Sequence, residues 1–187
     1  MKIKGSIIMT VAAMVAATVL VSCQSNAGAQ DETGNSATKS FSVDDFEPVY
    51  DDEADPAEQI RDAVKSAASS GRFVVCQVGG NWCKWCLLFA DSMLKDDEIA
   101  ELVDENFVYA HINVDKTGPD GKRIRFTEAM DMLGNPVRFG FPVFVVLDQD
   151  GNVLHVQDSS FLEEGNGYDR EKVLRFFRNW TPKALGR

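Results

Sequence analysis

Positive charge is in short supply in this chain. Its 19 Lys and Arg residues face 29 Asp and Glu residues, and the formal net charge is −10. A protein that binds nucleic acid, or that is held on an anionic membrane surface by charge, needs clustered basic residues. The composition therefore argues against both classes, and we expect no nucleic-acid partner.

Histidine is also scarce, since the chain has only two, His111 and His155. A zinc site needs about four ligands. Neither histidine stands at ligand spacing from the paired cysteines Cys83 and Cys86, and a third cysteine, Cys76, is the one other candidate nearby. We therefore expect no metal at this pair, and the chemistry considered below requires no bound cofactor.

A long hydrophobic run is missing as well. The apolar stretch at 7–21 follows two lysines and is too short for a membrane-spanning helix, which indicates a signal peptide over residues 1–22. It ends in Leu-Val-Ser-Cys, which resembles a bacterial lipobox, so Cys23 is expected to carry acyl chains such as palmitate. Each buried CH₂ of such a chain contributes about 0.8 kcal/mol to membrane binding. The alternative is an ordinary signal peptide followed by a chance cysteine.

Residues 23–53 contain few apolar side chains and become acidic toward their end. Such a composition predicts a disordered, extended tether behind the lipidated cysteine. Three aromatic residues are exceptions, namely Phe41, Phe46 and Tyr50, and they either dock on the domain or have no structural role. The remainder, 54–187, is long enough for one domain with a real core.

The pattern along the domain alternates between helix and strand. Asp55-Pro56 is a typical helix start, because Asp can cap the helix and Pro suits its first position. The continuous apolar run at 73–78 predicts a strand buried on both faces. This order favours a three-layer α/β/α sandwich with a mixed sheet. In chain order we expect helices over 55–70, 87–95, 97–106, 125–133 and 169–180, strands over 73–78, 107–114, 143–147 and 152–156, and a loop over 159–167.

Two cysteines, Cys83 and Cys86, stand two residues apart at a junction between a predicted strand and a predicted helix. This spacing at this place is typical of a redox pair. The positive end of the helix dipole favours the thiolate of Cys83, and the thiolate is the nucleophile. Cys86 follows on the same helical face and can resolve a mixed disulfide. The alternatives are a structural disulfide and one half of a zinc site.

Trp82-Cys83-x-x-Cys86 after a hydrophobic strand, together with Phe141-Pro142 before a second strand, resembles the thioredoxin superfamily. The resemblance covers roughly 54–180 and is closest to bacterial thioredoxin-like proteins with Trp-Cys-x-Trp-Cys sites. It implies a thioredoxin-like α/β/α sandwich. It also implies a cis peptide bond before Pro142 facing the cysteines, with the backbone of Phe141 available to pair with a substrate strand.

Three further residues of the motif are candidates for substrate binding. Trp82 and Trp85 are expected to form an apolar wall around the cysteines, with plain packing as the alternative for Trp85. Lys84 lies between the cysteines, and a cation there favours the Cys83 thiolate and a more oxidising pair. We expect this effect to be small because the side chain is exposed and screened.

Two residues before the motif bear on the chemistry. Thioredoxins carry a buried aspartate six residues before the first cysteine, and this chain has Gln77 there. Since an amide cannot titrate, another acid or water must serve the attack by Cys86, or that step is slower. Cys76 is expected to be a small buried core residue, with a regulatory thiol as the alternative.

These observations predict a membrane-tethered thiol–disulfide oxidoreductase in the cell envelope, its domain facing the periplasm or the exterior. We expect it to reduce protein or peptide disulfides through Cys83 and Cys86 and to draw electrons from a membrane protein. One alternative is a dithiol oxidase or isomerase. Another is a non-catalytic binding protein with this fold that holds a partner or a soft metal such as Cu(I).

Overall fold

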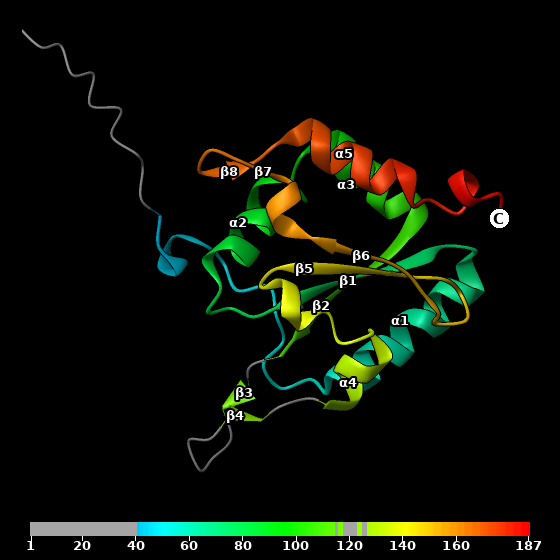
Figure 1. The fold of residues 1–187 in the computed structure, drawn as a ribbon, viewed down its shortest axis with the longest axis horizontal. Helices are drawn as coiled ribbons and strands as arrows, with labels where there is room; N and C mark the ends of the chain where they lie inside the picture. The colour runs from blue at the N-terminus through cyan, green and yellow to red at the C-terminus, as the bar shows by residue number, and fades with distance from the viewer. Residues whose placement is uncertain (1–40, 115, 118–122, 125–126) are drawn as a thin grey trace, which may run out of the picture. The chain divides into compact units, whose positions relative to one another are not determined.

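A four-stranded mixed sheet forms the centre of the computed structural model, which describes residues 41–114, 116–117, 123–124 and 127–187. The strand order is β2 (Phe107–Asn113), β1 (Phe73–Gly79), β5 (Val143–Leu147) and β6 (Val153–Asp158). β1 pairs in parallel with β2 and antiparallel with β5, and β5 pairs antiparallel with β6. The predicted mixed sheet is confirmed (Figure 1).

All seven residues of β1 are buried, as its continuous apolar run predicts. Successive side chains of a strand point to opposite faces of the sheet. Val74, Cys76 and Val78 accordingly join one hydrophobic cluster, whereas Phe73 and Val75 join another. Each face of the sheet therefore needs its own layer of helices.

The helices α1 (Pro56–Ser70) and α4 (Thr127–Met132) cover the first face. The carboxylate of Asp55 accepts hydrogen bonds from two backbone N–H groups of the first turn of α1, and the helix ends at Gly71 in the left-handed conformation, with φ of 71°. Only a residue without a Cβ adopts that conformation readily. The helix start and stop expected from the sequence are confirmed.

The second face is covered by α2 (Lys84–Ser92), α3 (Asp97–Asn106) and α5 (Arg170–Asn179) (Figure 1). Phe89 of α2 packs on Phe144 of β5, with ring centroids 4.5 Å apart, and both side chains are fully buried. Burying a side chain of this size contributes roughly 1.5–3 kcal/mol relative to exposure. This contact packs α2 on β5, and the predicted three-layer sandwich is confirmed.

Short elements complete the described part of the chain. The loop predicted over 159–167 is wrong in part, because a 3₁₀ turn and a pair of two-residue strands lie in and just beyond it. Such short strands carry no periodicity by which a sequence could reveal them. No helix among the described residues is both long enough and apolar enough to cross a membrane. The short elements are η1 (Val43–Asp45), η2 (Pro136–Phe139), η3 (Ser159–Phe161), η4 (Lys183–Leu185), β3 (Lys116–Thr117), β4 (Arg123–Ile124), β7 (Glu163–Glu164) and β8 (Gly167–Tyr168).

The folded domain extends before residue 54, the boundary that the sequence predicted. Tyr50 is only 4% exposed and packs with Cys83, Cys86 and Leu87. These residues belong to the folded domain rather than to a disordered tether, because a buried aromatic side chain outweighs the acidic composition around it. The expected signal peptide, Cys23 and the rest of the predicted tether up to residue 40 lie outside the described residues.

Candidate functional site

Cys83 and Cys86 form a disulfide at the start of α2, with their Cα atoms 5.2 Å apart. Cys83 is the N-cap residue, and its Sγ accepts a hydrogen bond from the backbone N–H of Cys86 at 3.2 Å. The predicted position of Cys83 at the helix start is confirmed. Cys83 is 7% exposed and Cys86 is fully buried, so Cys83 is the sulfur that a substrate can reach first.

Trp82 and Trp85 take different places beside the disulfide. The Trp82 side chain is 45% exposed and its ring stands edge-on to Phe141, with centroids 5.2 Å apart. Trp85 is half-buried and packs edge-on against Phe41 at 6.0 Å and Tyr168 at 5.6 Å. Trp82 therefore offers a free apolar surface, whereas much of Trp85 is engaged in packing.

Lys84 is exposed, and its ammonium nitrogen lies 5.1 Å from the centroid of the Phe41 ring. A cation over an aromatic face at an exposed site gains about 0.5–1 kcal/mol. This contact orients the side chain along the segment before α1.

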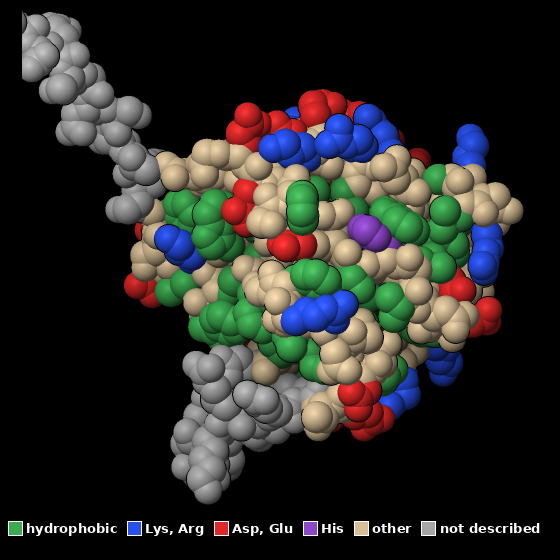
Figure 2. All heavy atoms as spheres, in the orientation of Figure 1, with side chains coloured by type: hydrophobic (Ala, Val, Ile, Leu, Met, Phe, Trp, Pro, Cys, Tyr) green, Lys and Arg blue, Asp and Glu red, His purple; other side chains and the backbone are tan. Residues whose placement is uncertain are grey.

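Phe141 and Pro142 lie at the entry to β5, and the peptide bond between them is cis, as the resemblance implied. Phe141 packs against the cluster that contains both cysteines. Two residues of the preceding η2, Val137 and Phe139, are 39% and 40% exposed. Hydrophobic side chains gather over α2 and η2 on the face seen in Figure 2. Phe141 and the adjacent Trp82 ring give the disulfide an apolar surround.

Gln77 lies in β1 beneath the disulfide and is fully buried. Its Nε2 donates to the Tyr50 hydroxyl at 2.7 Å and to the Cys86 carbonyl oxygen at 3.0 Å. The Tyr109 hydroxyl donates to its Oε1 at 2.6 Å. Because both N–H groups and the oxygen of the amide have partners, Gln77 satisfies the polar groups in the floor of the site.

Asn81, two residues before Cys83, holds the segment that carries Tyr50. Its Oδ1 accepts from the backbone N–H groups of Val49 and Tyr50 at 3.1 and 3.0 Å, and its Nδ2 donates to the Tyr50 carbonyl oxygen at 2.9 Å. The sequence reasoning missed Asn81 and left Tyr50 open. The available signal was a single aromatic residue, Tyr50, shortly before a helix start. Nothing in the local sequence distinguishes an aromatic side chain that packs on the domain from one that stays in solvent.

Cys76 lies on the other face of the sheet from Gln77, in the cluster under α1. It is fully buried, and burial raises the pKa of its thiol to about 12. The expectation of a small buried core residue is confirmed. Among the described residues, no three or more His, Cys, Asp and Glu side chains gather so that they could hold a metal ion.

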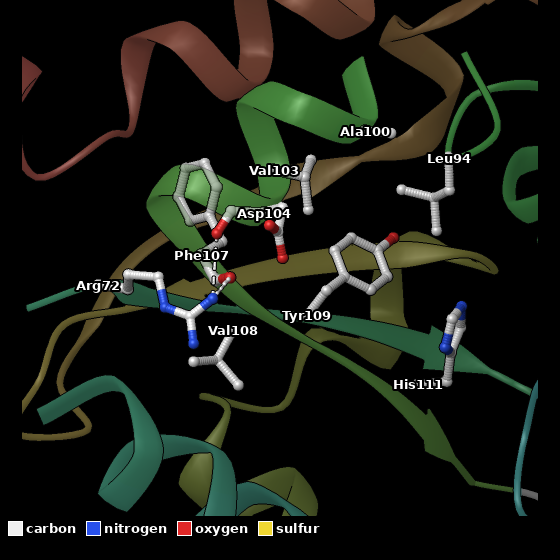
Figure 3. A pocket seen from close by; sticks show the side chains of 9 residues that line it. All are labelled: Arg72, Leu94, Ala100, Val103, Asp104, Phe107, Val108, Tyr109 and His111. Carbon is white, nitrogen blue, oxygen red and sulfur yellow. Dashed lines mark hydrogen bonds between the residues drawn. The ribbon is translucent and has the colours of Figure 1, made fainter. Parts of the chain in front are cut away.

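An open pocket of about 420 Å³ lies beside the outer strand β2 (Figure 3). At one end the guanidinium of Arg72 donates to the backbone carbonyls of Asp104 and Phe107. At the other end lies His111, whose ring meets Tyr109 edge-on at 5.3 Å. The pocket lining does not include the disulfide, and we assign it no part in the redox chemistry.

His111 stands opposite Gln77 in the parallel register of β1 and β2. Its ring also meets Tyr50 edge-on, with centroids 5.1 Å apart. Burial lowers the pKa of His111 to about 4, and its Nε2 has no hydrogen-bond partner among the described residues. The imidazole is therefore neutral at neutral pH.

The fold and the cysteine pair at the start of α2 define a thioredoxin-like protein. More particularly, the chain belongs to the family described as "Thioredox_DsbH: Protein of unknown function, DUF255", whose profile matches residues 50–180. That match begins at Tyr50, in agreement with the burial of this residue in the domain. No curated protein is similar enough to count as a match.

A solved structure supports this assignment. The crystal structure of a disulphide isomerase from Xylella fastidiosa Temecula1 is 25% identical, with a TM-score of 0.58, and the alignment covers 70% of this chain and 94% of the isomerase. A thioredoxin from Thermus thermophilus is 22% identical, with a TM-score of 0.47 over 68% of this chain and 88% of the thioredoxin. By its family match and its likeness to the isomerase, the chain is similar to thioredoxin-fold disulfide oxidoreductases.

Proposed function

We propose that this chain is a thiol–disulfide oxidoreductase tethered to a membrane in the cell envelope, and that it reduces disulfides in proteins or peptides. The observation that carries the proposal is the Cys83–Cys86 disulfide at the first turn of α2. Cys83 is the more exposed sulfur, and it stands where unpaired backbone N–H groups stabilise a thiolate.

In the reductive direction the Cys83 thiolate attacks one sulfur of a substrate disulfide. The substrate S–S bond breaks, and its electron pair leaves with the other substrate sulfur, which takes up a proton. Cys86 then attacks Cys83, and the second substrate sulfur leaves as a thiol. The substrate gains two electrons and two protons, and the protein ends as the Cys83–Cys86 disulfide.

The apolar surround of the disulfide supports a polypeptide substrate. Trp82 presents a 45% exposed ring beside Phe141, and an extended segment can lie across both. The backbone of Phe141 supplies the hydrogen-bonding groups for such a strand, as in other β-strand additions. Lys84 and Trp85 border the same site but are engaged with Phe41.

A disulfide isomerase or oxidase is the second candidate, because the similar protein from Xylella fastidiosa Temecula1 is a disulphide isomerase. The reduction potential of the pair separates the two directions. We would equilibrate the purified full-length chain with glutathione buffers and trap Cys83 and Cys86 by alkylation. A value near roughly −270 mV supports a reductase, and one near roughly −120 mV supports an oxidant or isomerase.

The matched controls for this experiment are two serine variants. Cys83→Ser is expected to abolish reduction of a model protein disulfide, whereas Cys76→Ser removes a buried thiol that the reaction does not use. A pair that never exchanges with glutathione, or a Cys83→Ser variant with full activity, would show that the disulfide is structural or that the protein only binds a partner.

The membrane tether and the electron donor are part of the same proposal. A signal-like segment, Cys23 and a polar stretch precede the domain in the sequence. Cys23→Ser is expected to move the protein from the membrane fraction to the soluble envelope fraction and to prevent incorporation of labelled palmitate. An unchanged membrane fraction would contradict lipidation. A Cys86→Ser variant, which cannot resolve mixed disulfides, would capture a membrane donor covalently through Cys83.

A further inference from the structure

The hydroxyl of Tyr50 and the sulfur of Cys86 face the same small space above Gly79. A Cβ added at Gly79 would lie 2.5 Å from the Cys86 Sγ and 2.8 Å from the Tyr50 Oη. The two atoms are therefore near neighbours, and the absence of a side chain at Gly79 is what lets them approach. Both residues are buried, Tyr50 at 4% exposure and Cys86 completely.

The hydrogen bonds of Gln77 fix the direction of the Tyr50 proton. The Cys86 carbonyl oxygen can only accept, so the amide atom that faces it must be Nε2. The second hydrogen of Nε2 then points to the Tyr50 hydroxyl, which must accept it. Among the described residues no hydrogen bond uses the proton of the Tyr50 hydroxyl, and the Cys86 sulfur is a nearby atom that can accept it once it is a thiolate.

Tyr50 is held in this place by the loop that carries the cysteines. Asn81 makes three hydrogen bonds to the backbone of Val49 and Tyr50. The same loop continues directly into Trp82 and Cys83. The position of the Tyr50 hydroxyl is therefore tied to the position of the cysteines, although 36 positions separate Tyr50 from Cys86 along the chain.

We propose that Tyr50 serves the resolving cysteine, by donating a hydrogen bond from its hydroxyl to the Cys86 sulfur when that sulfur becomes a thiolate. The inference rests on the proposed function. The Tyr50 hydroxyl supplies a hydrogen-bond donor to the sulfur. Gln77 cannot, since an amide that already donates to two partners has no proton left for it. Burial raises the pKa of the Tyr50 hydroxyl above its ordinary range, so the phenol keeps its proton and acts as a donor.

The resolving step then balances as follows. The Cys86 thiol loses its proton to water and becomes a thiolate, which the Tyr50 hydroxyl stabilises. The thiolate bonds to the Cys83 sulfur, the bond between Cys83 and the substrate sulfur breaks, and the electron pair leaves with the substrate sulfur, which takes a proton from water. Over the attack by Cys83 and this resolving step together, the two cysteines lose two electrons to the substrate, and Tyr50 is unchanged at the end.

The test compares Tyr50→Phe with Tyr109→Phe. Each variant keeps the aromatic ring and removes one hydroxyl that is hydrogen-bonded to Gln77. Only the Tyr50 hydroxyl faces the Cys86 sulfur. The first readout is the acid dissociation constant of the Cys86 thiol. It is measured by NMR on full-length chain that carries isotope-labelled Cys86 and in which the other three cysteines are replaced. A hydrogen bond to a charged group predicts about tenfold weaker dissociation in Tyr50→Phe. Tyr109→Phe is expected to change it by less than about threefold.

The second readout is the resolving rate. A mixed disulfide of Cys83 with thionitrobenzoate releases the coloured thiol when Cys86 attacks. Tenfold less thiolate, partly offset by its greater nucleophilicity, predicts about threefold slower release in Tyr50→Phe at neutral pH. If Tyr50→Phe does not fold, Asn81→Ala, which frees the backbone of Tyr50, should shift both readouts in the same direction.

The outcomes separate this inference from the proposed function. If wild-type Cys83 and Cys86 exchange with glutathione but Tyr50→Phe leaves the dissociation and the release rate unchanged, the role of Tyr50 is refuted and the redox function stands. Equal effects of Tyr50→Phe and Tyr109→Phe would also overturn the inference, because both would then act by loosening Gln77. If the wild-type pair does not exchange at all, the proposed function itself fails.

Discussion

Replacing His111 by Phe is expected to remove a pH-dependent part of the stability of this fold. The imidazole lies between the rings of Tyr50 and Tyr109, and burial lowers its pKa from 6.5 to about 4. Between these two values the unfolded chain binds a proton that the folded chain does not. The contribution is therefore fully present above about pH 6.5 and is lost as the pH falls toward 4.

The magnitude follows from the two pKa values. At 1.36 kcal/mol per pH unit, the full difference between 6.5 and about 4 corresponds to about 3 kcal/mol of unfolding free energy. At pH about 4.5, most of this loss, roughly 2.5 kcal/mol, has occurred in the wild type. The two tyrosines whose rings contact His111, Tyr50 and Tyr109, have hydroxyl pKa values that burial raises, so both stay neutral across this range.

The assay is urea unfolding of wild type and His111→Phe at several pH values between about 7 and about 4.5. The guanidinium of Arg170 lowers the pKa of Asp96, and the stability that such carboxylates contribute is lost at acid pH. This loss is the same in both proteins, so it cancels in the comparison. The wild-type free energy should fall more steeply than that of the variant. Parallel curves, with equal denaturant slopes, would refute the assignment of a buried neutral imidazole.

Two further predictions concern the strand that leads into the cysteines. Gly79→Ala should destabilise the protein by about 1–3 kcal/mol in thermal or urea unfolding, because its Cβ would lie 2.5 Å from the Cys86 Sγ and 2.8 Å from the Tyr50 Oη. Gly167→Ala, where a Cβ meets nothing within 4 Å, should change stability by less than about 0.5 kcal/mol, and similar losses for both would contradict the crowding at Gly79. Cys76 should resist alkylation in the native protein at neutral pH and react only after unfolding, since it is fully buried and its thiol pKa is raised to about 12; rapid native labelling seen by mass spectrometry would show that it is accessible.

Local patterns in the sequence were sufficient for the start of α1 and for β1, whereas α2 begins at Lys84, three residues before the predicted start at 87. Asp55 followed by Pro56 predicts the start of α1, because capping and the fixed φ of proline act over a few neighbouring residues. The run at 73–78 predicts β1 for a similar reason, since a strand buried on both faces must be apolar throughout. The spacing of Cys83 and Cys86 at the next junction predicts their place at the start of α2.

What surrounds the cysteines was decided by tertiary structure. Tyr50 lies in an acidic stretch that predicts a tether, and its burial depends on Gln77 and Asn81, which are 27 and 31 residues away. The place of His111 beside Gln77 depends on the parallel register of two strands separated by two helices. Side-chain periodicity reports which face of its own element a residue occupies, but contacts between distant elements arise only when the layers pack. The cysteine pair is therefore readable in the sequence, whereas the tyrosine, the amide and the imidazole around it are brought together only by the fold.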